Sequence, residues 1–105
     1  MIPKNMNEIM RQAQKMQTKM NQLQDEMGKK EITASAGGGM VEATVNGQGN
    51  LIRIHIERDV VDPEDREMLG DLIVAAVSEA QRQAKETMQQ EINSITGGLN
   101  LPGLF

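Results

Sequence analysis

The sequence predicts an α+β subunit in which one helix is followed by a three-stranded antiparallel sheet and a longer helix (α-β-β-β-α). Three observations predict this fold. Apolar residues recur at intervals of three and four over residues 5–28 and again over residues 63–96, which is typical of helices. Residues 31–57 instead alternate apolar and polar residues, which is typical of strands with one exposed face. The chain has 105 residues, so we expect a single domain over residues 1–105.

The first helix is predicted over residues 5–28. Asn5 is placed to cap its start, with Glu8 in the reciprocal capping position, and Gly28 is placed to end it. The apolar residues of this helix fall on two heptad positions, which indicates a narrow seam that packs against another helix or forms part of the core. The seam consists of Met6, Ile9, Ala13, Met16, Met20, Leu23 and Met27.

Three short strands are predicted within residues 31–57, joined by turns at Gly37-Gly38-Gly39 and at Gly47-Gln48-Gly49-Asn50. Four-residue loops at both turns give a register with one apolar face and one polar face. In this register Val41 lies opposite Ile56, Ala43 opposite Ile54, Val45 opposite Ile52, and, on the polar face, Glu42 opposite His55.

The second helix is predicted over residues 63–96. Asp62-Pro63-Glu64-Asp65 is a strong start signal and Gly97-Gly98 is the expected stop. This helix would be about 50 Å long, whereas a compact chain of this size has a radius of gyration of about 13 Å. Its far end must therefore project or lie against a second chain, which predicts a homodimer. The pattern leaves open whether the two chains share a continuous sheet or only pack helices.

Residues 97–105 are predicted to be a flexible apolar tail, with a docking peptide as the alternative. Composition also excludes several functions. With no cysteine and one histidine, the chain has no disulfide, no thiolate metal site and little acid–base chemistry, so we expect no enzyme activity, metal, cofactor or small-molecule substrate. No charge-free segment reaches the roughly 20 residues that span a bilayer, so we expect a cytoplasmic protein without membrane contact.

The net charge of −4 is unevenly distributed. Residues 1–30 carry a net charge of +3, whereas residues 31–105 carry −7. Seven acidic residues lie between Glu57 and Asp71, a segment that we call the acidic belt. The overall charge argues against nucleic acid as a partner, but the basic first helix does not.

Several segments, in order along nearly the whole chain, resemble the YbaB/EbfC family of bacterial nucleoid-associated proteins. They are residues 10–17 (MRQAQKMQ), 37–41 (GGGMV), 45–47 (VNG), 62–65 (DPED), 72–77 (LIVAAV), and the glycines and proline of residues 97–103. The resemblance implies a tweezer-shaped homodimer that binds duplex DNA with little sequence preference and is associated with the nucleoid. Gly70 and Glu57 depart slightly from the family pattern.

The expected DNA contacts are basic. Arg11, Lys15 and Lys19 are spaced by four residues and form a row on the first helix, away from the apolar seam. Lys29 and Lys30 extend the basic end, and Arg82 and Lys85 are secondary contacts because acidic residues surround them. Two alternatives remain open. The basic row could be an ordinary solvated face, or the chain could be a protein-interaction module that recruits a partner through its Met-rich seam and apolar tail.

Overall fold

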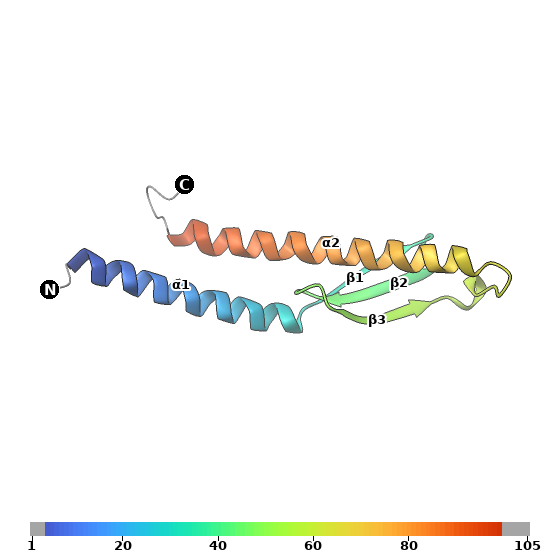
Figure 1. Cartoon of the computed structure of the whole chain (residues 1–105), viewed down its shortest axis with the longest axis horizontal. Helices are drawn as coiled ribbons and strands as arrows, with labels where there is room; N and C mark the ends of the chain where they lie inside the picture. Colours follow the sequence, from blue (N-terminus) through green and yellow to red (C-terminus); the bar gives the residue numbers. More distant parts are fainter. Residues whose placement is uncertain (1–3, 100–105) are drawn as a thin grey trace.

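The computed structural model describes residues 4–99 and confirms the predicted order of helix, three strands and long helix (Figure 1). The three strands form one antiparallel sheet in the order β1-β2-β3. The elements are α1 (Lys4–Lys29), β1 (Glu31–Ala36), β2 (Val41–Asn46), β3 (Leu51–Ile56), a short 3-10 helix η1 (Arg58–Val60) and α2 (Arg66–Leu99).

The described chain is strongly elongated. The first part of α2 covers one face of the sheet, and the rest of α2 extends beyond it in the same direction as α1 (Figure 1). The chain measures 74 × 23 × 17 Å, and its radius of gyration is 20.4 Å. This radius is well above the roughly 13 Å of a compact chain of this length. The two helices contact each other. We call α1 and residues 80–99 of α2 the fork.

The core lies between the sheet and α2 and is built from small side chains. Ala76, Ala80 and Ala84 recur every four residues on α2 and are fully or almost fully buried, which lets the helix approach the sheet closely. Val41 and Val45 are the largest side chains that are fully buried. The complete core cluster is Ala34, Val41, Ala43, Val45, Val60, Ala76, Ala80 and Ala84.

The first hairpin agrees with the prediction and the second does not. Gly37, Gly38 and Gly39 all have positive φ and form the expected four-residue turn. In the second turn the Asn46 N–H donates to the Asn50 carbonyl at 2.9 Å, which leaves three residues between this pair rather than four. Gly49 adopts a φ of 89°, and the Asn46 Oδ1 accepts the backbone N–H groups of Gln48 and Asn50, both at 3.0 Å.

This shorter loop changes the register at one position. Val45 pairs with Leu51 instead of Ile52, through an irregularity between Thr44 and Val45. Ile52 is therefore displaced from the core face and is 46% exposed, whereas Ile54 still packs against the core. The other predicted pairs, Val41 with Ile56, Ala43 with Ile54 and Glu42 with His55, are confirmed.

The polar face of the sheet is held by cross-strand contacts. Arg53 on β3 donates to both carboxylate oxygens of Glu31 on β1, at 2.8 and 3.0 Å. His55 lies opposite Glu42 as predicted, and its ring also contacts Glu57 at 3.4 Å, just beyond the end of β3. Both groups are exposed, so this pair contributes little stability.

The predicted bounds of the first helix need correction. Helix α1 already begins at Lys4, so Asn5 lies inside the first turn rather than at the cap. It also continues one residue past Gly28, because its end is fixed by contacts with the second hairpin turn rather than by a glycine in the left-handed conformation. The backbone N–H of Gly47 donates to the Met27 carbonyl at 2.7 Å, and the Asn46 amide donates to the Gly28 carbonyl at 3.4 Å.

The predicted bounds of the second helix also need correction. The Asp62 side chain accepts the N–H of Glu64 at 2.9 Å and therefore caps a separate turn before the helix. The Asp65 side chain accepts the N–H of Met68 at 3.2 Å, and α2 starts at Arg66. The helix continues through Gly97-Gly98 to Leu99, since glycine weakens a helix by about 1 kcal/mol without ending it. The predicted tail is therefore helical at its first three residues, and residues 100–105 lie outside the described residues.

Candidate nucleic-acid interface

The basic row of α1 forms one continuous surface in the structure. Arg11, Lys15 and Lys19 line an open groove of about 440 Å³, together with Gln14, Thr18 and Gln22. All three basic side chains are exposed, and none pairs with a carboxylate among residues 4–99. Successive members are about 6 Å apart along the helix, and the polar neighbours add hydrogen-bonding groups. We call Arg11, Lys15 and Lys19 the α1 ridge.

The apolar seam on the other face of α1 is covered only at its C-terminal end. Leu23 and Met27 are buried where the helix meets the second hairpin turn, and Met16 and Met20 are half-buried. Ala13 is exposed, and so are Met6 and Ile9, at 48% and 60%. The first half of the seam therefore has little cover from the described part of the chain.

Lys29 and Lys30 are exposed, but they do not join the α1 ridge. Lys29 lies 18 residues after Arg11, which is about 27 Å along a helix. It occupies the last turn of α1, where a cation interacts favourably with the helix dipole. These two lysines therefore form a separate basic site near the sheet.

Arg82 and Lys85 have different surroundings, although the sequence grouped them. Arg82 is held between two carboxylates of its own helix, with contacts of 2.7 Å to Glu79 and 2.9 Å to Glu86. Lys85 makes no ion pair within residues 4–99 and lines a pocket beside the second hairpin turn. Lys85 is therefore the better placed of the two to bind an anion.

The Arg82 cluster makes a testable prediction about pH. Hydrogen bonds from Arg82 and then Gln83 lower the pKa of Glu79 from 4.5 to about 2. Because the pKa is lower in the folded chain, the pair stabilises the fold above about pH 4.5, and this contribution is lost as the pH falls toward 2. It is small because the groups are exposed.

In Arg82→Gln we expect the pKa of the Glu79 carboxyl to rise from about 2 towards 4.5, with Gln83 still lowering it somewhat, whereas in Lys85→Gln it should stay near 2. A ¹³C NMR titration of the glutamate carboxyls in both variants measures this. An unchanged Glu79 midpoint in Arg82→Gln would contradict the assignment.

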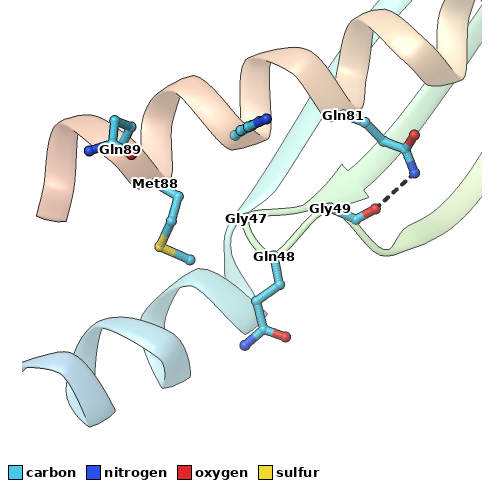
Figure 2. A pocket seen from close by; sticks show the side chains of 7 residues that line it. Gly47, Gln48, Gly49, Gln81, Met88 and Gln89 are labelled. Carbon is cyan, nitrogen blue, oxygen red and sulfur yellow. Dashed lines mark hydrogen bonds between the residues drawn. The ribbon is translucent and has the colours of Figure 1, made fainter.

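The pocket beside Lys85 lies at the junction of the two helices of the fork, and we call it the fork root. It has a volume of about 380 Å³ (Figure 2). Met88 and Gln89 come from α2, and the turn residues form the other wall (Figure 2). The seven lining residues are Gly47, Gln48, Gly49, Gln81, Lys85, Met88 and Gln89.

The second hairpin turn connects both helices of the fork. The Gln48 side chain donates to the Gln24 carbonyl of α1 at 2.8 Å. The Gln81 side chain of α2 donates to the Gly49 carbonyl at 3.1 Å (Figure 2). The sequence pattern does not identify Gln48, Gln81 or Gln89 as site residues. A glutamine between two turn glycines is the only local signal, and it does not reveal which helix the side chain reaches.

The acidic belt lies at the other end of the molecule from the projecting part of α1 (Figure 1). It includes η1, the turn that follows it and the start of α2. Its carboxylates do not form a group suited to holding a metal ion, a finding that covers residues 4–99. Within the same range, no helix has the length and hydrophobicity needed to cross a membrane. The described chain thus has a basic helical end and an acidic end.

Comparisons with known proteins agree with this picture. A nucleoid-associated protein from Alkaliphilus metalliredigens is 52% identical over 101 residues, which cover 96% of this chain and 89% of the relative. A nucleoid-associated protein from Pelotomaculum thermopropionicum is 45% identical over 105 residues, the full length of both chains. An uncharacterized protein from Helicobacter pylori has a crystal structure that matches with a TM-score of 0.75 at 20% identity, over 91% of this chain and 99% of that chain, and shares the fold. Residues 3–99 match the YbaB/EbfC DNA-binding family, and with relatives this similar over most or all of their length, the chain belongs to that family.

Proposed function

We propose that this protein is a nucleoid-associated protein of the bacterial cytoplasm that binds duplex DNA as a homodimer, mainly through the phosphate backbone. It would thereby affect nucleoid organisation and gene expression. Its relatives are named nucleoid-associated proteins, and its family is a DNA-binding family.

The α1 ridge is the single observation that carries the proposal. Arg11, Lys15 and Lys19 are exposed on one face and unpaired within residues 4–99. Cations that are free of acidic partners can neutralise phosphates without first breaking an ion pair. Further contacts are proposed from Lys29, Lys30, Lys85 and, less favourably, Arg82.

Exposed apolar residues support the homodimer. Leu51 and Ile52 lie on the edge strand β3 and are 47% and 46% exposed. Val74 on α2 is 65% exposed, and it lies seven residues before Gln81, which bonds to Gly49 next to β3. Residues seven apart share a helix face, so Val74 lies on the same flank as β3. Large apolar side chains on one flank are typical of an interaction surface.

Low sequence preference follows from the chemistry of the α1 ridge and its neighbours. Lysine, arginine, glutamine and threonine side chains on such a face position a protein on phosphates but carry no sequence information by themselves. The chain has no tryptophan or tyrosine and only one phenylalanine, so it lacks an aromatic platform for stacking on unpaired bases. Duplex DNA is therefore favoured over single strands.

The test is a binding titration on several unrelated duplexes at a series of salt concentrations, together with a light-scattering mass of the free protein. Six ridge cations in a dimer predict a slope of log affinity against log salt of about −5, with similar slopes for every duplex. The mass should be twice 11.6 kDa. Binding that hardly responds to salt, or a mass of 11.6 kDa, would contradict the proposal.

A protein-interaction module is the second candidate. The exposure of Met6, Ile9 and Met10, at 48%, 60% and 51%, favours it because they present apolar surface along the first half of α1. An apolar interface depends little on salt, whereas phosphate contacts weaken steeply. The salt titration therefore separates the two candidates.

A further inference from the structure

The fork root is a pocket whose lining combines the apolar Met88 side chain with glutamine and lysine side chains. No carboxylate lines it, although acidic residues outnumber basic ones in the chain. Glu79 and Glu86, two of the three acidic residues within six positions of Lys85 on α2, both pair with Arg82. Lys85 therefore supplies the only formal charge of the pocket lining, and that charge is positive.

The backbone donors of the turn are already used. The N–H groups of Gly47 and Gly49 donate to the carbonyls of Met27 and Asn46, and the N–H of Gln48 donates to the Asn46 side chain. The turn is thus held rigidly and does not depend on a ligand for its shape. A ligand at the fork root must be bound by the side chains.

Three side-chain amides and one ammonium group remain to bind a ligand. Each amide nitrogen carries two hydrogens, and one is used in each case: Gln48 donates to the Gln24 carbonyl, Gln81 to the Gly49 carbonyl and Gln89 to the Asn93 side chain. These bonds orient the amides and leave one hydrogen on each. The three donors of Lys85 have no carboxylate partner within residues 4–99.

We propose that the fork root binds one phosphodiester group of the duplex DNA backbone, with Lys85 neutralising its charge and Gln48 and Gln89 donating hydrogen bonds to its oxygens. A phosphodiester has one negative charge and two free acceptor oxygens, which suits one ammonium group and amide donors that line the same pocket. Met88 provides an apolar surface beside this group. This inference rests on the proposed function.

The consequence is a fixed anchor for DNA between the two helices. The turn is bonded to α1 through Gln48 and to α2 through Gln81. A phosphate held at the fork root is therefore held at a defined position relative to the α1 ridge, and its contact sets where the duplex lies along the fork.

The test compares Lys85→Gln with Arg82→Gln in the full chain. Both changes remove one positive charge from an exposed side chain of α2, three residues apart, so their long-range effect is the same. We expect Lys85→Gln to make the slope of log affinity against log salt less steep by about 1 per chain. The same change should weaken duplex binding by about tenfold at 100 mM salt. Arg82→Gln should lower the slope clearly less than Lys85→Gln does, because Glu79 and Glu86 already hold this arginine in ion pairs.

Equal effects of the two variants, with the unchanged protein still binding DNA, would overturn the phosphate anchor but not the proposed function. No binding by the unchanged protein would overturn both. NMR of the glutamine side-chain amides provides a second measurement. Duplex DNA should shift the signals of Gln48 and Gln89, and shifts caused by inorganic phosphate but not by the duplex would overturn the assignment to the DNA backbone.

Discussion

Replacing Arg11, Lys15 and Lys19 together with glutamate is expected to abolish duplex binding while the chain stays folded and dimeric. All three side chains are exposed and without carboxylate partners in the described chain, so their removal breaks no ion pair. Two ridges contribute six cations to a dimer, and reversing them replaces phosphate attraction by repulsion. We expect affinity to fall at least a hundredfold at about 150 mM salt.

Fluorescence anisotropy of a labelled duplex measures the loss, and light scattering and circular dichroism check assembly and folding. A matched pair of variants controls for net charge. Lys15→Glu/Lys19→Glu and Arg58→Glu/Arg66→Glu change the charge by the same amount, but the second pair lies in the acidic belt. Binding should be lost only in the first. If both pairs weaken binding equally, the α1 ridge is not the contact surface.

The α1 ridge and most of the sheet could be predicted because both depend on local periodicity. Four-residue spacing places side chains on one helix face whatever the tertiary structure, and it correctly grouped Arg11, Lys15 and Lys19. The alternation of apolar and polar residues likewise predicted the correct sheet face for the strand residues, as far as Thr44 on β2 and its partner Arg53 on β3. The register failed only where the side chain of Asn46 and the left-handed Gly49 formed a shorter loop.

The fork root could not be predicted because it depends on contacts between residues far apart in the sequence. Gln48 reaches a carbonyl 24 residues earlier, and Gln81 reaches one 32 residues earlier. The same limit applies to the cations of α2. The sequence places acidic residues around both Arg82 and Lys85, but only the structure shows that Glu79 and Glu86 both bind Arg82.

Replacing Gly47 with alanine is expected to detach the end of α1 from the second hairpin turn. A Cβ atom at Gly47 would lie 2.5 Å from the Met27 sulfur, 2.7 Å from the Met27 carbonyl oxygen and 2.9 Å from the Met27 Cβ. The carbonyl oxygen is the atom that accepts the Gly47 N–H, so the clash and the lost hydrogen bond occur together. We expect a loss of about 1–3 kcal/mol in the free energy of unfolding, as for other overpacked sites.

Urea unfolding followed by circular dichroism measures this loss, and Gly70→Ala is the control. Gly70 lies in α2, and a Cβ atom added there would meet nothing within 4 Å beyond the neighbouring backbone of its own helix, so the same change should stabilise the helix by up to about 1 kcal/mol. The effect on DNA then tests the fork itself. Gly47→Ala leaves every basic residue in place. If the folded variant loses DNA binding, the position of α1 relative to the fork root matters for binding. If its affinity for DNA is unchanged, the α1 ridge binds DNA independently of the fork root.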